Sequence, residues 1–188
     1  MGTAKGDMDA FLNNDYGQEM ARAMQMLAKD PHTLFLYQNY GRVGWTLADV
    51  PKEQKIDLPI IEDVQMGMSI GLSLSGFIPV SCYARWNFLL CATNQLVNHV
   101  DKLEQMSDGG YKPGVIIRTA VGSTVPLYPG CQSDGDYTNA FRLMLTNIEV
   151  VVLREAEDIY PAYTKALRLA KAGKSTLLVE IGNQYENQ

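Results

Sequence analysis

The feature that most constrains the fold is a regular alternation of short apolar runs with longer stretches of helical periodicity. Strands buried on both faces of a sheet appear as continuous apolar runs, and the intervening helices supply the crossovers that parallel strands need. The sequence therefore predicts an α/β fold, an open and mostly parallel sheet with helices on both faces. The expected strands are residues 33–38, 58–61, 78–84, 115–119, 149–153 and 176–181.

Helices are expected between these strands. Asp15 is a plausible N-cap of the first helix, with Gln18 three residues later as in a capping box, and Asp30-Pro31 ends that helix. Residues 39–57 are predicted to form a long loop. The other helices are expected at residues 64–75, 88–105 (with Leu89, Ala92, Leu96, Val100 and Leu103 facing the core), 137–145 and 158–172, the last with Pro161 in its first turn.

The helix expected at residues 64–75 has a special composition. It is apolar nearly all round, which indicates burial on every side. Gly67, Gly71 and Ser75 are spaced by four residues and form a smooth stripe where another backbone could approach closely. The stripe fits either packing within the domain or contact with a partner helix. Gly76 is a natural C-cap.

Length and composition set limits on the function. The 188 residues suit one domain, expected at residues 15–188 after a flexible segment at 1–14. A net charge of −5 argues against a nucleic-acid partner, because phosphate binding calls for a basic face. Residues 66–80, the most apolar stretch, are too short and too broken by Gly, Ser and Pro to span a membrane. We expect a cytoplasmic protein, since the N-terminus lacks the apolar core of a signal peptide.

The cysteines and histidines do not form a recognisable site. Three cysteines and two histidines are widely spaced, so neither a disulfide framework nor a metal site within the chain is expected. These residues are Cys82, Cys91, Cys131, His32 and His99.

One block is specific. Residues 57–80 (DLPIIEDVQMGMSIGLSLSGFIPV) contain an acidic residue, Pro59 and Glu62, then the spaced glycines, then a Gly-x-x-Pro sequence that ends at Pro79. This block closely resembles the pyrimidine-binding domain of the transketolase and 2-oxo acid dehydrogenase families, and most of all the beta subunit of the dehydrogenases. The resemblance continues without a gap through Trp86-Asn-Phe88 and the helix up to Lys102, and extends over nearly all of the chain.

The resemblance implies a thiamine-diphosphate (ThDP) site. Glu62 occupies the position of the family's catalytic glutamate, and Phe88 that of the aromatic ring that stacks on the aminopyrimidine. Ile60 is expected among the cofactor-binding residues. In the family, the glutamate hydrogen-bonds the ring nitrogen N1′ and so favours the imino tautomer of the cofactor, which removes the thiazolium C2 proton. A carboxyl group at a dry interface suits this role, because burial favours its protonated form.

The resemblance also implies a partner. In these families a separate diphosphate-binding domain completes the site and holds Mg²⁺, so we expect an alpha-like subunit, an alpha2beta2-type hetero-oligomer and no activity in this chain alone. The partner's mark is Gly-Asp-Gly followed by an Asn roughly thirty residues later. Asp134-Gly135-Asp136 is superficially similar, but no strand precedes it and no suitably spaced Asn follows, so we interpret it as a turn.

Two departures from the family pattern bear on function. Ungapped counting from Arg118 places Cys131 where the family has a histidine near the substrate, and a small gap would place Ser133 or Asp134 there. No histidine lies in residues 121–147. Cys131 could be a nucleophile, but a buried, inert thiol is the favoured interpretation. The chain also stops at Gln188, before the family's C-terminal domain, which argues against docking on a lipoyl-bearing core.

Three functional hypotheses follow. The leading one is a subunit of a two-chain ThDP enzyme that cleaves or forms a carbon–carbon bond next to a carbonyl, in a 2-oxo acid or a ketose. The second is a scaffold or regulatory subunit with a degenerate pyrimidine domain, which the lost histidine favours and the retained Glu62 and Phe88 oppose. The third, an unrelated α/β domain that binds another small molecule, ranks lowest.

Overall fold

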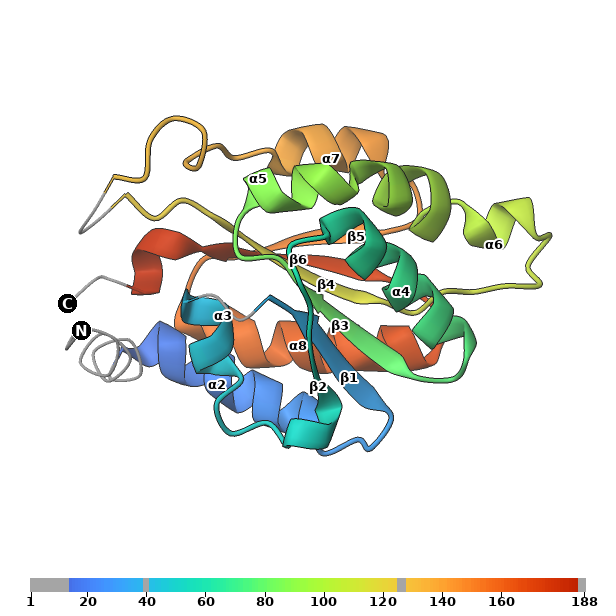
Figure 1. The fold of residues 1–188 in the computed structure, drawn as a ribbon, viewed down its shortest axis with the longest axis horizontal. Helices are drawn as coiled ribbons and strands as arrows, with labels where there is room; N and C mark the ends of the chain where they lie inside the picture. Colours follow the sequence, from blue (N-terminus) through green and yellow to red (C-terminus); the bar gives the residue numbers. More distant parts are fainter. Residues whose placement is uncertain (1–13, 39–40, 125–127, 186–188) are drawn as a thin grey trace.

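The protein forms one six-stranded, fully parallel sheet (Figure 1). The computed structural model describes residues 14–38, 41–124 and 128–185; the segment expected at 1–14 lies almost entirely outside this range. The predicted α/β fold is confirmed. In the order β2-β1-β3-β4-β6-β5, the strands are β1 (Thr33–Tyr37), β2 (Lys55–Asp57), β3 (Ile78–Cys82), β4 (Ile116–Val121), β5 (Glu149–Leu153) and β6 (Thr176–Ile181).

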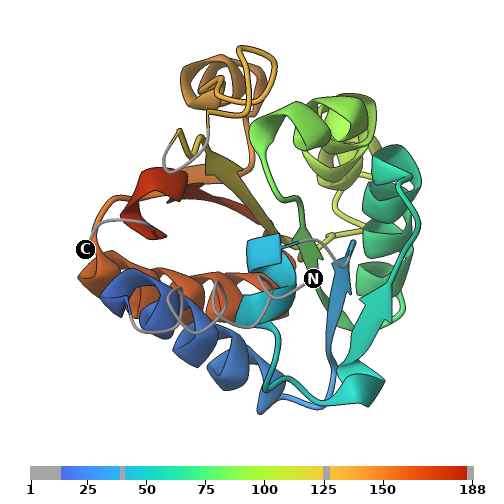
Figure 2. The same ribbon diagram turned by 60° about the vertical axis from the view of Figure 1, so that its left-hand side comes forward.

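Helices cover both faces of the sheet, which explains why the strands are apolar throughout. One layer contains α2 (Asp15–Ala28) and α8 (Ala156–Lys171), and the other contains α4 (Glu62–Leu74), α5 (Trp86–Leu89) and α7 (Thr138–Met144) (Figures 1 and 2). Each layer has its own core. Fully buried members include Met20, Met24, Leu27, Phe35 and Tyr163 on the first face, and Met66, Trp86, Leu89, Leu96 and Phe141 on the second.

Two helix starts differ from the sequence-based prediction. The N-cap of α2 is Asn14, not Asp15, because the Asn14 Oδ1 atom accepts hydrogen bonds from the Tyr16 and Gly17 amides. A capping box between Glu155 and Asp158 starts α8 two residues earlier than predicted. Pro161 is therefore the sixth residue of α8 and lies beyond its first turn.

The predicted long loop at residues 39–57 is wrong. It contains α3 (Gly41–Thr46), a 3-10 turn (Lys52–Gln54) and β2. The strand predicted at 58–61 is also wrong, because the chain pairs with β1 earlier, with Lys55 opposite Phe35 and Asp57 opposite Tyr37. β2 is an edge strand, so its charged residues keep contact with water and leave no apolar signal in the sequence.

The helix predicted at residues 88–105 is a succession of short helical segments. After α5 come a 3-10 turn (Leu90–Ala92), a π-helix (Gln95–Val100) and α6 (Leu103–Met106). Of the predicted core-facing residues, Leu89, Ala92, Leu96 and Val100 are buried; Leu103 is only partly buried, contrary to expectation.

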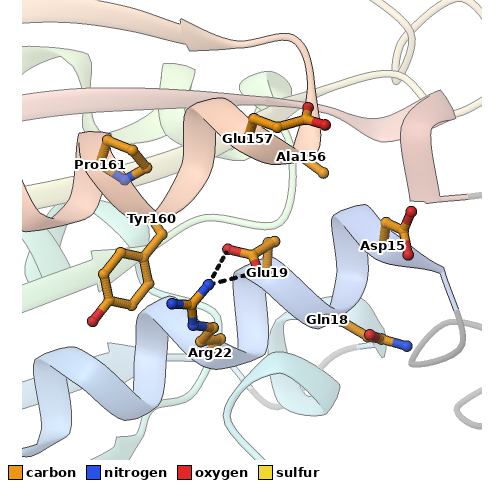
Figure 3. A pocket seen from close by; sticks show the side chains of 8 residues that line it. All are labelled: Asp15, Gln18, Glu19, Arg22, Ala156, Glu157, Tyr160 and Pro161. Carbon is orange, nitrogen blue, oxygen red and sulfur yellow. Dashed lines mark hydrogen bonds and ion pairs between the residues drawn. The ribbon is translucent and has the colours of Figure 1, made fainter.

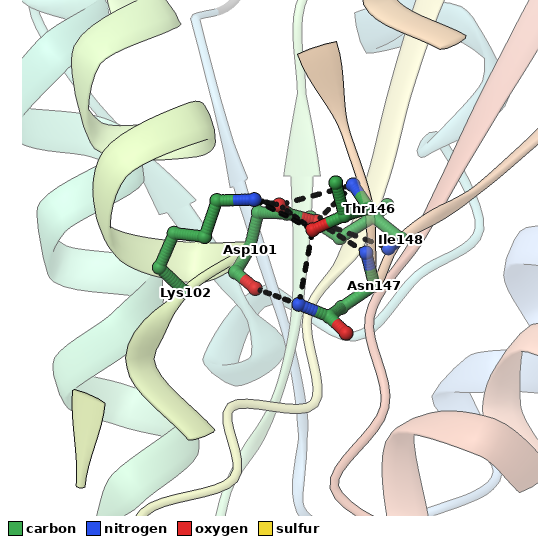
Figure 4. A network of polar contacts seen from close by, with 5 residues as sticks. All are labelled: Asp101, Lys102, Thr146, Asn147 and Ile148. Atoms are coloured by element: carbon green, nitrogen blue, oxygen red, sulfur yellow. Dashed lines mark hydrogen bonds and ion pairs between the residues drawn. The ribbon is translucent and has the colours of Figure 1, made fainter. Parts of the chain in front are cut away.

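Asp101 explains the irregular end of the π-helix. Its side chain is fully buried and accepts hydrogen bonds from the backbone amides of Thr146, Asn147 and Ile148, at 2.7–3.2 Å, and from the Lys102 ammonium at 2.6 Å (Figure 4). The chain must turn out of regular α-helical geometry to present this carboxylate to the segment before β5. Asp101 thus joins two parts of the second helical layer.

The strand order defines where a ligand would bind. From β1 the chain moves outward to β2 and then returns to β3 on the other side of β1, so the order reverses between β1 and β3. In open α/β sheets, ligands bind at the carboxyl ends of the strands next to such a reversal. At this point the chain leaves β1 and β3 toward opposite faces of the sheet. The segment after β1 leads to α3, which packs beside α2, and the segment after β3 leads to α5 in the other layer.

Candidate functional site

Glu62 lies at this reversal of strand order. It is the first residue of α4, two residues earlier than the predicted helix start, and it points to the same side of the helix as the buried residues Gln65, Met66 and Ser69. Glu62 is only 7% exposed. The structure therefore buries the carboxyl group that the sequence singles out, at the carboxyl edge of the sheet.

A chain of hydrogen bonds fixes the backbone at Glu62. The fully buried Gln65 amide donates from Nε2 to the carbonyl oxygens of Leu36 in β1 and Cys82 in β3, at 3.3 and 3.0 Å, and to Ser81 Oγ at 3.3 Å. Ser81 donates to the Tyr83 hydroxyl, which donates to the Glu62 backbone oxygen at 3.3 Å. The first turn of α4 is thus bonded to both strands that flank the reversal.

The Glu62 carboxylate itself is still available for a ligand. Among the described residues, none donates a hydrogen bond to it or forms an ion pair with it. Burial is the main cause that raises the pKa of Tyr83, and the nearby Glu62 and Asp63 carboxylates add to it, so the Tyr83 hydroxyl remains a neutral donor. A largely buried carboxyl group that has no protein donor can form a hydrogen bond with a ligand, and a ring nitrogen is a suitable partner.

Phe88 lies on α5, directly after β3. It is partly buried, so part of its ring surface remains accessible. Trp86 anchors this short helix: it is 1% exposed and packs against Phe141 of α7, with 4.8 Å between ring centroids. The rigid packing of Trp86 sets the position of Phe88 two residues later. This fits a stacking surface, although no contact between Phe88 and Glu62 is seen.

The prediction that α4 is buried on every side is wrong. Its outer face exposes Val64, Met68 and Leu74, which are 37–50% exposed, and Ile60 just before the helix is 75% exposed. A Cβ atom built on Gly71 would meet no heavy atom within 4 Å. The α4 sequence is indeed apolar nearly all round, but the structure of this chain leaves one apolar face of the helix exposed.

The two residues predicted to lie near the substrate, Cys131 and Ser133, are both in the loop after β4 and differ in exposure. Ser133 is partly buried, and its carbonyl oxygen accepts a hydrogen bond from the Arg85 Nη1 atom at 3.3 Å. Cys131 is exposed, so its interpretation as a buried thiol is wrong. The turn predicted at 134–136 follows a hydrogen-bonded turn in which the Ser133 amide donates to the Gly130 oxygen.

Sequence reasoning missed Arg85. It precedes the quoted Trp-Asn-Phe sequence, yet nothing in the local pattern shows that its side chain reaches the loop after β4. Its Nη1 atom also lies 3.5 Å from the Ser123 oxygen, so Arg85 bridges the two ends of that loop. The signal that could have found it is the position of a cation directly after a strand of a parallel sheet.

A second arginine near this edge has a structural role. Arg118 of β4 is 1% exposed and forms a bidentate ion pair with Glu180 of β6, at 2.7 and 3.1 Å. It also donates to the Thr46 hydroxyl at the end of α3, at 2.9 Å. The Tyr185 hydroxyl donates to the same carboxylate. These bonds hold α3 against the sheet, and the ion pair with Glu180 neutralises the charge of Arg118.

A groove in the described part of the chain lies away from the predicted site. It has a volume of about 410 Å³ and runs between α2 and α8 on the outside of the first helical layer, where Arg22 is paired with Glu19 and stacked on Tyr160 (Figure 3). None of the predicted site residues lines it. Over the described ranges, no cluster of three or more metal-ligating His, Cys, Asp or Glu side chains is present, and no helix is both long and apolar enough to cross a membrane.

The parallel α/β fold is the one that the resemblance to pyrimidine-binding domains predicted. In this fold, Glu62 is buried at the reversal of strand order and Phe88 follows the next strand. No protein-family model matches the chain.

Curated proteins show the sequence relationship. The chain is 33% identical over 97 residues to the chloroplastic pyruvate dehydrogenase E1 component subunit beta-3 of Arabidopsis thaliana, which covers 48% of this chain and 24% of that protein. It is 28% identical over 133 residues to the mitochondrial subunit beta of Saccharomyces cerevisiae, covering 70% of this chain and 36% of that one. The chain thus spans about a quarter to a third of the length of these relatives.

Solved structures show the same fold. The inactive beta4 tetramer of a split-gene transketolase aligns with a TM-score of 0.66 and 20% identity, over 88% of this chain and 48% of that one. A thiamin diphosphate-dependent enzyme from Mycobacterium smegmatis aligns with a TM-score of 0.60 and 13% identity, over 88% and 31%. The predicted resemblance to the pyrimidine-binding domain of the transketolase and 2-oxo acid dehydrogenase families is therefore confirmed.

Proposed function

We propose that this chain is the pyrimidine-binding subunit of a two-chain ThDP-dependent enzyme that cleaves or forms a carbon–carbon bond next to a carbonyl. The observation that supports this most is the burial of Glu62 at the reversal of strand order, without a hydrogen-bond donor among the described residues. The relationship to pyruvate dehydrogenase E1 beta subunits favours a 2-oxo acid substrate over a ketose.

The residues of this chain fit the aminopyrimidine half of the cofactor. Glu62 would hydrogen-bond the ring nitrogen N1′, Phe88 would stack on the ring, and Ile60 would contact it from the exposed segment before α4. When bound, ThDP supplies a carbon nucleophile for the substrate carbonyl. The hydrogen bonds through Gln65 and Tyr83 hold Glu62 in position, so the carboxyl group need not reorganise when it holds or releases its proton.

The diphosphate and Mg²⁺ would be held by an alpha-like partner chain. The exposed apolar face of α4, with Val64, Met68, Gly71 and Leu74, lies next to Glu62 and is the surface that such a partner would cover. Covering this face would exclude water from the carboxyl group. We propose a hetero-oligomer of the alpha2beta2 type, in which this chain alone is inactive.

The test is a set of matched variants in the reconstituted enzyme. The chain is co-expressed with a candidate partner that carries Gly-Asp-Gly and a downstream Asn, and ThDP binding and turnover of pyruvate are measured for wild type, Glu62→Gln and Asp63→Asn. Asp63 is the matched control, since it is an exposed acid in the same helical turn. We expect Glu62→Gln to lower turnover by about 10²-fold or more, because it removes a group that gives and takes a proton.

Two results would contradict the proposal. If the Glu62→Gln enzyme turned over as fast as wild type, Glu62 would have no catalytic role. If this chain alone saturated with ThDP and turned over substrate, the site would not be shared between two chains. Asp63→Asn should match wild type in both measurements.

A scaffold or regulatory subunit is the second candidate, favoured by the absence of a histidine from residues 121–147. A scaffold would bind the alpha-like partner but would not depend on Glu62. A partner complex that forms normally, and that is equally active or equally inactive with Glu62 and Gln at this position, would support it.

A further inference from the structure

α3 borders the reversal of strand order from the first helical layer, as the first turn of α4 does from the second. It is the first helix after β1, and its residue Val43 is buried in the core that α2 and α8 form with the sheet. In open α/β sheets, a ligand lies in the crevice between the segments that leave the strands at such a reversal. α3 and Glu62 therefore lie on opposite sides of the proposed ThDP site.

α3 depends on the sheet for its position. It has six residues, and an isolated helix shorter than about 12–15 residues is marginal in water. Thr46, in its last turn, is 2% exposed; its hydroxyl donates to the Val43 oxygen and accepts from the Arg118 Nη1 atom, both at 2.9 Å. Just beyond the helix, Lys55 of the edge strand donates to the Leu47 oxygen at 3.0 Å. Arg118 is thus the buried anchor of α3.

Arg118 is also bonded to the other side of the site. Its guanidinium pairs with Glu180 through Nε and Nη2, which leaves Nη1 for Thr46. Its backbone oxygen accepts a hydrogen bond from the Tyr83 amide at 2.9 Å, and the Tyr83 hydroxyl donates to the Glu62 backbone oxygen. One residue of β4 therefore holds α3 with its side chain and, through Tyr83, the start of α4 with its backbone.

We propose that Arg118 and Thr46 are positioning residues of the ThDP site, which dock α3 on the sheet in the arrangement that admits the cofactor beside Glu62. This inference rests on the proposed function and adds a determinant of cofactor affinity remote from Glu62. Neither side chain touches a reacting atom. ThDP would bind only chains in which α3 is docked, so its apparent affinity would fall in proportion to the docked fraction.

The first experiment is amide hydrogen exchange, followed by mass spectrometry, on the full chain alone. Thr46→Val keeps the size of the side chain but removes the hydroxyl that accepts from Arg118. The amides of Leu47, Ala48 and Val50 report on docking, since they are hydrogen-bonded in and just after α3. We expect these amides to exchange about 10- to 100-fold faster in Thr46→Val, as for the loss of one hydrogen bond to a charged group.

Two variants serve as controls. Thr46→Ser keeps the hydroxyl and should exchange as wild type does. Thr119→Val makes the same chemical change in the same strand as Arg118, at a fully buried threonine whose hydroxyl has no hydrogen-bond partner in the structure. It should also exchange as wild type does.

The second experiment measures ThDP binding by calorimetry, and turnover, in the complex with the alpha-like partner. We expect Thr46→Val to weaken ThDP binding by about 3- to 10-fold and to leave kcat at saturating ThDP unchanged, because the cofactor selects the docked chains. Thr46→Ser should restore the affinity. A general loss of stability would instead lower the number of binding sites and kcat, without changing the affinity of the molecules that remain folded.

Several results would overturn the inference: unchanged exchange in Thr46→Val, faster exchange with unchanged ThDP affinity, or an equal loss of affinity in Thr119→Val. If Glu62→Gln abolishes turnover while Thr46→Val binds ThDP as wild type does, the proposed function holds and the role of Thr46 does not. If the wild-type complex binds no ThDP, the proposed function fails and this inference fails with it.

Discussion

Among single residues, the site depends on buried polar groups that are hydrogen-bonded to one another. Gln65, Ser81 and Tyr83 come from α4, β3 and the segment after β3, and their hydrogen bonds converge on the backbone of Glu62. Glu62 was found from its sequence pattern. Tyr83 and Gln65 were not, because a tyrosine after a strand and a glutamine in a helix have many ordinary roles. Only their contacts show that they position the carboxyl group.

Replacing Tyr83 with Phe tests this arrangement. The variant keeps the ring but removes the hydroxyl that donates to the Glu62 oxygen and accepts from Ser81. We expect a loss of about 1–2 kcal/mol in the free energy of unfolding, the usual cost of hydrogen bonds lost in a buried site. Turnover of the complex should fall, but by less than in Glu62→Gln, since the carboxyl group remains. Urea unfolding and steady-state kinetics measure the two effects; unchanged values in both would show that Tyr83 is only filling space.

At the element scale, the irregular segment from α5 to α6 departs most from its expected form. Its apolar spacing predicted one continuous helix, and four of the five predicted core positions are indeed buried: Leu89, Ala92, Leu96 and Val100. Periodicity alone could not show the π-helix, because that turn is set by Asp101 and its bonds to residues 146–148, some forty-five positions away in the sequence. The same bonds hold the chain in place before β5.

The Asp101 contacts predict a dependence of stability on pH. Burial alone would raise the pKa of Asp101, but the Lys102 ammonium and the amides of Asn147 and Thr146 outweigh it and lower the pKa below its ordinary value of 3.8. A lowered pKa means that the carboxylate stabilises the fold fully above the ordinary value. This stabilisation is lost as the pH falls through the lower pKa of the folded state.

Asp101→Asn should therefore lower the free energy of unfolding by about 2–3 kcal/mol near pH 7. The asparagine side chain has only one acceptor oxygen, and its NH2 group would face backbone amides that are themselves donors. The difference from wild type should begin to shrink below about pH 4, where Asp101 of the unfolded wild-type chain takes up a proton, and should shrink further as the pH falls through the lower pKa of the folded state. Urea unfolding at several pH values measures both. A difference that stays constant from pH 7 to pH 3 would contradict the account.

At the scale of the whole molecule, the two helical layers differ. The layer of α2 and α8 closes a core against the sheet, whereas α4 in the other layer leaves an apolar face exposed next to Glu62. A chain that leaves such a face open beside a buried carboxyl group has the shape of a part that another chain completes.

Gly71→Leu tests whether a partner covers α4. Nothing lies within 4 Å of a Cβ atom at this position, so the free chain should fold as well as wild type, or better, since leucine is a stronger helix former than glycine by roughly 1 kcal/mol. The larger side chain should nevertheless prevent a partner backbone from approaching. We expect the complex with the alpha-like chain to weaken by tenfold or more in a titration followed by size-exclusion chromatography or calorimetry.

The matched control is Thr164→Leu, which places the same side chain on the exposed face of α8 in the opposite layer. This variant should bind the partner as wild type does. If both variants bind equally well, the stripe on α4 serves packing within the chain rather than contact with a partner.

Local sequence patterns were enough to predict the fold class, five of the six strands to within two residues at each end, and the position of Glu62 close to the start of the helix that follows the edge strand. These follow from local composition, because strands buried on both faces must be apolar along their length and helices must show their own period. The glycine pattern added the family resemblance.

The other features depend on contacts between distant parts of the chain. The tertiary structure placed the edge strand at Lys55–Asp57, turned the predicted long helix into short segments, left one face of α4 open, and brought Arg85 to the loop after β4. Each of these features depends on neighbours that are distant in the sequence. The edge strand β2 pairs with only one other strand, and the buried Asp101 carboxylate binds amides from another part of the chain. The exposure of α4 depends on whether another element lies opposite it. The local periodicity of a segment shows which of its side chains can be buried. The packed structure determines which neighbours cover those side chains, and whether any do.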